Sequence, residues 1–353
     1  MKLFIPGPTD VREDVLDAMS RPPISHRGEE AIGLFRTVTE RAQRIMGTKN
    51  AVVLSTSSAT GLMEAAVRCG SNRKILSLVN GAFGARWNEI ALLNGRAADR
   101  LEVPWGEAID PAAVEEKLRT GHYDAVTVPH SETSTGVANP IAAIGEVVKK
   151  YADVAYMVDT VSSLGGMPVN VDEMGIDLCL ASVQKCLALP PGFSLCSVST
   201  KILERARLIP DRGWYFDLAR MADSAAKGQA TITPSLPHLF AMERQFALIL
   251  EEGLPARWER HRRMADAARA WAKNTFELYA REEICSDSVT CILNSRGIDL
   301  GAMLSELKRR GYLLSNGYGD LKGKAFRIAH MGERRPAEVE KLLGVIDDVL
   351  TGM

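Results

Sequence analysis

The sequence has few of the features that mark a secreted protein or a metal site. Its six cysteines stand singly at positions 69, 179, 186, 196, 285 and 291, and no two form a CxxC pair. Several lie in apolar runs, as reduced core thiols do. We therefore expect neither a disulfide framework nor a bound metal. Cys186 directly follows a lysine and could act as a nucleophile, although a small packed residue is its more common role.

An excess of charge and a long hydrophobic run are also absent. The chain has 43 Lys and Arg against 44 Asp and Glu, so its electrostatics give no reason to expect nucleic acid or an anionic membrane as a partner. No apolar run approaches the length of a membrane span. The first eight residues contain too short an apolar run for a signal peptide. We expect a cytoplasmic protein whose partners are small molecules.

The middle of the sequence alternates between strand-like apolar runs and amphipathic segments. The predicted strands are residues 51–54, 74–79, 101–103, 125–128 and 154–158, and the predicted helices are residues 59–68, 82–93, 111–118 and 141–149. Repeated βα units of this kind predict an α/β domain with a mostly parallel sheet covered on both faces. A later run, residues 194–199, is expected to return antiparallel and close the sheet.

The two ends of the chain are expected to form separate parts. A short helix capped by Thr9 or Asp10 and a long helix over residues 31–45 come first, and helical pieces over residues 214–221 and 239–276 follow the sheet. After residue 282, strands and helices again alternate, which indicates a smaller α+β domain. We expect an N-terminal arm over residues 1–15, a large domain over 16–252 and a small C-terminal domain over 253–353.

A lysine follows the apolar run of residues 178–183. Gln184 and Lys185 come directly after this predicted strand and before the stop Pro190-Pro191-Gly192. Open α/β sheets bind ligands outside the carboxyl ends of their strands, and a neutral lysine amine can condense with an aldehyde to form a Schiff base. Lys185 is therefore a candidate cofactor anchor. A solvated loop lysine is the alternative, since most lysines are surface charges.

Two further strand ends carry polar residues. Asp159 ends an apolar strand and needs a cationic or hydrogen-bonding partner there, for which a protonated pyridine nitrogen would serve; a loop-capping aspartate is the alternative. The small polar residues from Ser55 to Gly61 lie between a strand and a helix, where N–H groups and hydroxyls can bind a phosphate. An ordinary helix cap is the alternative for this stretch.

An aromatic residue and an arginine complete the set. Phe83 stands among small residues at a strand-to-helix junction and could stack on a planar ligand, or be a core residue. Arg327 interrupts a short apolar strand, where a guanidinium could bind a substrate carboxylate, or could simply face outward. Together with Lys185 and Asp159, these residues are the parts that pyridoxal phosphate needs when it acts on an amino acid.

Nearly end to end, the sequence resembles the class V aminotransferases of fold-type I pyridoxal phosphate enzymes, especially the alanine–glyoxylate and serine–pyruvate group. The resemblance rests on ordered motifs: Pro6-Gly7-Pro8-Thr9, Ser25-His26-Arg27, Asn80-Gly81-Ala82-Phe83-Gly84, Glu132-Thr133-Ser134-Thr135-Gly136-Val137, Val158-Asp159, Gln184-Lys185-Cys186-Leu187, Arg212-Gly213-Trp214-Tyr215, Thr233-Pro234 and Arg327-Ile328. It implies a homodimer with shared active sites.

The resemblance also implies a role for each site residue. Lys185 would hold the cofactor as a Schiff base and move a proton, and Asp159 would keep the ring nitrogen protonated. Phe83 would stack on the ring, and Thr133 would bond to the ring hydroxyl. The phosphate would be held by Ser58, Ala59, Thr60 and Gln184, with Thr233 from the other subunit. Arg327 and Gly7 would contact the substrate.

The function that the resemblance implies is transfer of an amino group from alanine or serine to glyoxylate or pyruvate. Three other class V reactions stay open. In these the amino donor and acceptor are 2-aminoethylphosphonate and pyruvate, pyridoxamine and pyruvate, or ureidoglycine and glyoxylate. A cysteine desulfurase or other lyase is a different possibility on the same fold. That chemistry needs a thiol on a mobile loop, and residues 315–324 contain no cysteine.

Overall fold

A computed structural model describes all 353 residues of the chain. Its largest sheet has seven strands in the order β2 (Ala51–Ser55), β10 (Ser194–Val198), β9 (Leu178–Ser182), β8 (Ala155–Asp159), β5 (Ala125–Pro129), β3 (Lys74–Val79) and β4 (Ala97–Glu102). Six of these strands run parallel. β10 is antiparallel to both β2 and β9, so the predicted antiparallel return is confirmed, although it lies inside the sheet and not at its edge.

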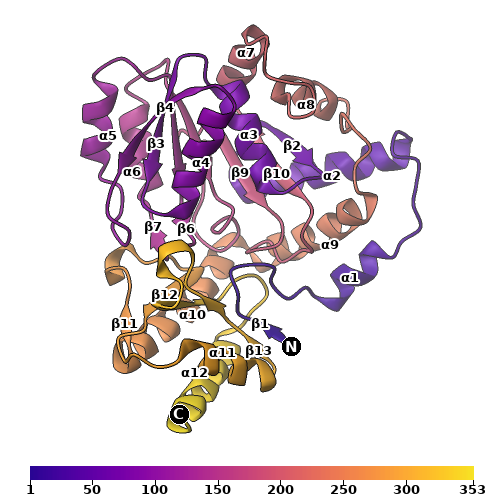
Figure 1. Cartoon of the computed structure of the whole chain (residues 1–353). Coiled ribbons are helices and arrows are strands. Elements are labelled where there is room, and N and C mark those ends of the chain that lie inside the picture. The colour runs from indigo at the N-terminus through magenta and orange to yellow at the C-terminus, as the bar shows by residue number, and fades with distance from the viewer.

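Helices cover both faces of this sheet because the strand side chains alternate between two apolar cores (Figure 1). In β3, Leu76 and Leu78 enter one core and Ile75 enters the other. The first core is covered by α2 (Glu29–Met46), α5 (Pro111–Leu118), α6 (Ile141–Val148) and α9 (Leu236–Glu252). The second is covered by α3 (Ala59–Gly70), α4 (Ala82–Leu93), α7 (Thr200–Leu208) and α8 (Leu218–Ala225).

The C-terminal part has its own core and its own sheet. An antiparallel sheet of β11 (Glu277–Leu278), β12 (Val289–Leu293), β15 (Ala325–Ala329) and β14 (Ser315–Asn316) packs with α10 (Leu254–Thr275), α11 (Leu300–Arg309) and α12 (Pro336–Thr351). Gly253 separates α9 from α10 with a φ of 81°. This break supports the division that we propose between residues 252 and 253.

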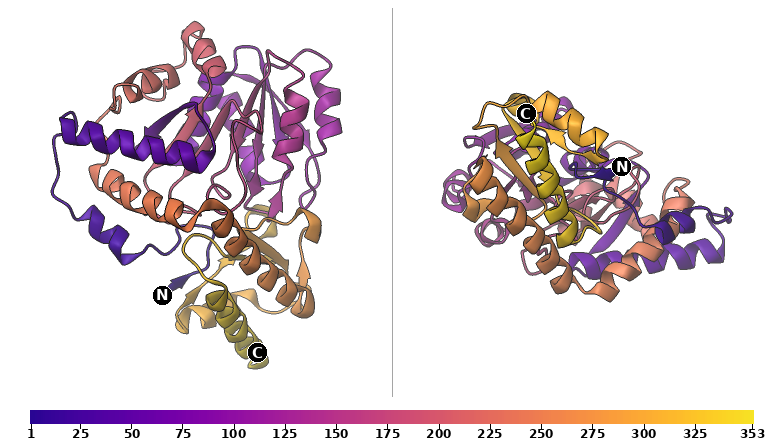
Figure 2. Two further views of the ribbon diagram at one scale, coloured as in Figure 1. Left: turned by 180° about the vertical axis from the view of Figure 1, so that it is seen from behind. Right: turned by 90° about the horizontal axis from the view of Figure 1, so that it is seen from below.

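The N-terminal arm connects the two parts. β1 (Lys2–Leu3) pairs in parallel with β13 (Tyr312–Leu313), and Phe4 is buried in the C-terminal core. The chain then passes to α1 (Glu13–Met19), which packs on α9. Both termini therefore lie at the small domain (Figure 2). The remaining short pairing joins β6 (Ser131–Glu132) and β7 (Val137–Ala138).

Some predicted element boundaries were wrong. The predicted helix over residues 214–221 begins only at Leu218, because the Asp217 carboxylate accepts from the N–H groups of Ala219 and Arg220 and so caps α8 there. The helix α1 starts after Arg12 and has no side-chain cap, so neither Thr9 nor Asp10 caps it. β4 begins four residues before its predicted start, since this exposed edge strand has no continuous apolar run. None of the helices combines the length and the apolar character that a membrane crossing requires.

Candidate active site

The carboxyl ends of the parallel strands meet at one cavity, which the small domain completes. The chain leaves β2, β3, β5, β8 and β9 at the same edge of the sheet, and residues that follow each of these strands line the cavity together with residues from β14, β15 and the arm. All the predicted site residues line this cavity except Thr233. The parallel topology therefore brings together motifs that are far apart in the sequence.

Lys185 is buried in the turn that follows β9. Its Nζ donates to Ser162 Oγ at 2.6 Å and to Thr133 Oγ1 at 3.3 Å, and only 7% of the residue is exposed. Burial lowers the pKa of Lys185 to about 8 because the charged amine loses its hydration. About a tenth of the amine is therefore neutral, and hence nucleophilic, at pH 7, far more than for an ordinary lysine. The solvated-lysine alternative does not hold.

Asp159 ends β8 and lies in the same cavity. Its Oδ1 accepts from the Val161 N–H at 2.7 Å, and no cationic side chain forms an ion pair with it. Burial raises the pKa of Asp159 to about 6 because the carboxylate is removed from water. A cationic ring nitrogen would relieve this penalty by pairing with the carboxylate. Lys185 also favours the charged form of Asp159 through space.

Phe83 is fixed at the start of α4 by a buried carboxylate. Glu132 accepts from the N–H groups of Phe83 at 3.0 Å and Gly84 at 3.1 Å. A negative charge on this carboxylate is stabilised by the positive end of the helix dipole. Gly81 makes this approach possible, because a Cβ there would lie 2.4 Å from Glu132 Cγ. Glu132 belongs to a motif of the sequence, but its role as this cap was not predicted.

The start of α3 offers donors that no other part of the chain uses. Ser58 stands at the N-cap in an extended conformation, and its side chain makes no capping hydrogen bond. Ser58 and Thr60 are exposed, and both line the cavity beside Ala59. Gln184 also lines the cavity, with its Oε1 accepting from Ser182 Oγ at 2.5 Å. Hydroxyls and free N–H groups at a helix N-terminus suit a phosphate.

Arg327 enters the cavity from β15 of the small domain. It is 7% exposed and donates to the carbonyl oxygens of Thr133 at 3.1 Å and Asn316 at 3.1 and 3.2 Å. The alternative of an outward-facing arginine is therefore wrong. Its guanidinium makes no ion pair within the chain, which leaves its charge available to a substrate carboxylate.

Residues 3–319 match the family profile described as aminotransferase class-V. The chain belongs to this family. An uncharacterized aminotransferase of Methanocaldococcus jannaschii is 41% identical over 98% of this chain and 91% of the relative. The serine–glyoxylate aminotransferase of Methylorubrum extorquens is 32% identical over 94% of this chain and 86% of the relative. The resemblance found in the sequence is thus confirmed.

Solved structures agree with this assignment. The aspartate aminotransferase of Thermus thermophilus superposes with a TM-score of 0.93 at 28% identity, covering 100% of this chain and 99% of that chain. The predicted fold-type I architecture, an α/β large domain with a smaller C-terminal domain, is confirmed by this similarity together with the observed sheet. The protein is therefore an aminotransferase.

The cavity of this aminotransferase fits the pyridoxal phosphate that the family implies. Asp159 is a buried carboxylate without a cationic partner, as a protonated ring nitrogen requires. The unused hydroxyls of Ser58 and Thr60 at the start of α3 suit the phosphate. Lys185 supplies an amine whose lowered pKa suits reaction with an aldehyde. Each part of the cofactor thus has a chemical counterpart in the cavity.

The N-terminal arm of the aminotransferase reaches Lys185 directly. Gly7 has a φ of 102°, and a Cβ there would lie 3.2 Å from Lys185 Cγ. A side chain at this position would therefore be strained and would also crowd the lysine. Gly7 thus lines the same cavity as Lys185 and Arg327.

Several cavity residues were missed by the sequence analysis, and three of them make polar or aromatic contacts with the predicted residues. Ser162 accepts from the lysine amine, Tyr318 stacks on Phe83 with ring centroids 5.6 Å apart, and Arg86 donates to the Tyr318 hydroxyl at 2.9 Å. Arg86 follows Phe83 by three residues in α4, so helical spacing could have placed it on the same face. Tyr318 lies in a loop, where no sequence periodicity indicates which way a side chain points.

Thr233 lies outside the cavity of its own chain. It is exposed in the segment that precedes α9, where Ser235 N donates to Thr56 Oγ1 at 3.1 Å. The predicted contact with the cofactor phosphate was assigned to the other subunit of a dimer. This contact stays a prediction.

Cys186 is packed and not reactive in this aminotransferase. The residue is fully buried, and its thiol donates to the Ser162 carbonyl at 3.3 Å. Burial raises the pKa of Cys186 to about 11, so the nucleophilic thiolate is scarce at neutral pH. Its place next to Lys185 reflects packing against the chain near Gly166.

Proposed function

We propose that this enzyme transfers the amino group of a small L-amino acid, alanine or serine, to glyoxylate or pyruvate, with pyridoxal phosphate bound to Lys185. The observation that carries the proposal is the meeting of Lys185, Asp159 and Arg327 in one cavity. An amine, an acid and a free guanidinium are the groups that cofactor attachment, ring protonation and carboxylate binding require.

The chain's residues divide the work between holding and proton transfer. Bound pyridoxal phosphate supplies an aldehyde for attachment and a protonated ring that withdraws electrons from the substrate Cα. Lys185 would hold the cofactor, and its amine would move the Cα proton as a general base. Ser162 and Thr133 orient this amine through their hydroxyls. Asp159 would hold the proton on the ring nitrogen of the bound cofactor.

Substrate binding is assigned to Arg327 and to the arm. The guanidinium is held by two backbone carbonyls and is mostly buried, so it can bind a substrate carboxylate with little loss of side-chain entropy. Relatives named serine–glyoxylate aminotransferase support small substrates of this kind. Thr233 would complete the phosphate site from a second copy, which makes the proposed active unit a homodimer.

Other class V reactions remain as alternatives for the substrate. Relatives named ureidoglycine–glyoxylate and pyridoxamine–pyruvate transaminases are each 30% identical to this chain. A 2-aminoethylphosphonate enzyme would have to bind a phosphonate in place of the carboxylate. A desulfurase is disfavoured, because Cys291 is buried within β12 and burial raises its thiol pKa to about 12.

A half-reaction screen tests the proposed function. The holoprotein is mixed with one amino donor at a time, and conversion of the cofactor is followed by its visible absorption. We expect conversion with alanine or serine and reversal on addition of glyoxylate or pyruvate, while Lys185→Ala gives neither. Conversion with 2-aminoethylphosphonate alone, or with none of the donors, would overturn the proposal.

A further inference from the structure

The guanidinium of Arg327 is held by backbone carbonyls from both domains. Nη1 donates to the Thr133 carbonyl of the large domain at 3.1 Å, whereas Nε and Nη2 donate to the Asn316 carbonyl of the small domain at 3.2 and 3.1 Å. Because a guanidinium has five N–H groups, these three bonds leave one N–H free on each Nη. Two such N–H groups suit the bidentate binding of a carboxylate. Their direction depends on where β14 places the Asn316 carbonyl.

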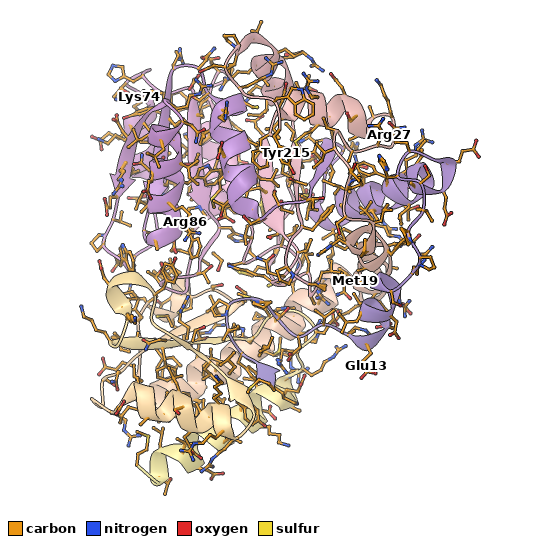
Figure 3. The ribbon with its side chains drawn as sticks, turned by 45° about the vertical axis from the view of Figure 1, so that its right-hand side comes forward. Glu13, Met19, Arg27, Lys74, Arg86 and Tyr215 are labelled. Atoms are coloured by element: carbon orange, nitrogen blue, oxygen red, sulfur yellow. The ribbon has the colours of Figure 1, made fainter.

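Tyr318, two residues after Asn316, fastens this segment to the large domain. Its hydroxyl accepts from Arg86 Nη2 at 2.9 Å, and its ring stacks on Phe83 with centroids 5.6 Å apart and an interplanar angle of 28°. Both partners lie in α4, and Arg86 lies at the side of the large domain that faces the small domain (Figure 3). The bond to Arg86 is the single hydrogen bond between residues 315–324 and the large domain. The stack and the hydrogen bond therefore restrain the position of this segment.

The same tyrosine also contacts the arginine that it would position. The Tyr318 ring centroid lies 5.6 Å from the Arg327 guanidinium carbon, within the range of a cation–π interaction. The neighbouring backbone adds one more contact with the large domain, because a Cβ at Gly319 would lie 3.3 Å from the ring of Trp105. Tyr318 is half-buried and lines the cavity together with Arg327. One side chain thus touches α4, the cavity and the carboxylate-binding group.

The two ends of an amino acid substrate would be bound by different domains. Lys185 follows β9 of the large domain, whereas Arg327 belongs to β15 of the small domain. The amino group and the carboxylate of one substrate are joined through a single carbon, so the two domains must hold their groups in a fixed relative position. Binding and catalytic groups need to be placed to within about 0.5 Å of the productive geometry. A contact that fixes the β14 segment relative to α4 restricts this position from the Arg327 side.

We propose that Tyr318 is a positioning residue for the substrate carboxylate: by fastening residues 315–324 to α4, it fixes the free N–H groups of Arg327 relative to Lys185. Asn316 transmits the position, because its carbonyl accepts two of the three hydrogen bonds that Arg327 donates to the backbone. The hydroxyl supplies the bond across the domain boundary, and the ring supplies the contacts with Phe83 and Arg327. This inference rests on the proposed function and adds a residue to its carboxylate site.

Steady-state kinetics of the holoenzyme with alanine and glyoxylate provides the first test. We expect Tyr318→Ala to raise the KM for alanine about 10-fold while kcat changes by less than about threefold, because uniform binding of the carboxylate is weakened. Tyr318→Phe, which loses only the hydroxyl, should raise KM about threefold. Tyr151→Phe removes the hydroxyl of another half-buried tyrosine, in the large domain, and should leave KM unchanged. In an Arg327→Gln background, Tyr318→Ala should have no further effect on KM.

Ligand binding and amide exchange test the same role without turnover. Propionate, which is alanine without its amino group, is titrated into the holoprotein by ligand-observed NMR, and its Kd should rise about 10-fold in Tyr318→Ala. Amide hydrogen exchange of residues 316–324 in the full chain should be about fivefold faster in Tyr318→Phe than in the wild type, because one bond across the domain boundary is lost. The affinity of both variants for pyridoxal phosphate should stay within about threefold of the wild type.

An unchanged KM and an unchanged propionate Kd in Tyr318→Ala would overturn the proposal. So would an equal loss of kcat, cofactor affinity and propionate binding, which indicates a general structural role, or an effect of Tyr318→Ala that persists in the Arg327→Gln background. A wild-type enzyme that binds propionate but converts neither alanine nor serine would refute the proposed function. The propionate and exchange measurements would still decide the role of Tyr318 in that case.

Discussion

Lys185 and Asp159 show how burial prepares the site before any ligand is bound. The pKa of the amine is lowered to about 8 and that of the carboxyl is raised to about 6, so burial moves both groups toward their neutral forms. Each shift means that burying the charged form of the group costs free energy of folding. The apoprotein bears this cost because no cofactor is there to offset it. A cofactor that reacts with the amine and offers a cation to the carboxylate relieves both costs. The residues that destabilise the empty site are thus the ones proposed to bind the cofactor.

Asp159→Asn should stabilise the apoprotein while abolishing turnover. The raised pKa means that ionised Asp159 costs the fold about 3 kcal/mol above pH 6, whereas well below the unfolded pKa of 3.8 the carboxyl is neutral in both folded and unfolded states. Asparagine is neutral at every pH. We therefore expect a higher free energy of unfolding in urea at pH 8, and a gap to the wild type that narrows as the pH falls to 4.5. A variant that is less stable than the wild type at pH 8 would contradict this account.

The sequence could identify the site residues that stand at strand ends, but it could not identify the contacts that they make. Lys185, Asp159 and Phe83 lie where apolar runs stop, and the order of parallel strands brings them together. The partnership of Arg86 with Tyr318 could not be predicted, because it depends on how two domains pack. Side-chain direction in the loop after β14 likewise follows from tertiary contacts and has no local signal.

Among the elements, the start of α4 is packed around a glycine. Gly81→Ala should lower the free energy of unfolding by about 2 kcal/mol, because the new methyl would overlap buried Glu132 and Ser134, which cap the helix. The matched control is Gly344→Ala in α12, where nothing lies within 4 Å and alanine should stabilise the helix by about 0.5 to 1 kcal/mol. Urea unfolding measures both. Equal effects of the two substitutions would refute this packing argument.

Element prediction succeeded where apolar runs were continuous and failed where exposure interrupted them. The buried strands β5, β8 and β9 lie within or next to their predicted ranges, since their side chains face a core on both sides of the sheet. β4 was only partly found because its exposed edge has few apolar residues. The start of α8 was misplaced although its cap, Asp217, is a readable signal.

Across the whole molecule, Arg257 ties the small domain to the loop that bears Lys185. It is 1% exposed in α10, donates to the carbonyls of Gly165 and Cys186, and pairs with Glu252 and Glu333 at 2.8 Å. Removing the Arg257 guanidinium would leave the two carboxylates and both carbonyls without this partner at the same time. The position of Lys185 is therefore coupled to the packing of the two domains.

Arg257→Met should lower the free energy of unfolding by about 3 kcal/mol or more, since it leaves buried acceptors and carboxylates unpaired. Arg262→Met, on the same helix, removes exposed pairs with Glu259 and Asp266 and should change stability by less than about 1 kcal/mol. Thermal or urea unfolding of the two apoproteins provides the comparison. Similar losses for both variants would show that the buried network does not stabilise the fold.

The central claim is that Lys185 carries the cofactor in a cavity assembled from both domains. The most direct measurement is borohydride reduction of the protein loaded with pyridoxal phosphate, followed by peptide mapping by mass spectrometry. The account predicts one modified lysine, Lys185, and no stable modification in Lys185→Ala. A label on another lysine, or no label in a protein shown to be folded, would contradict it.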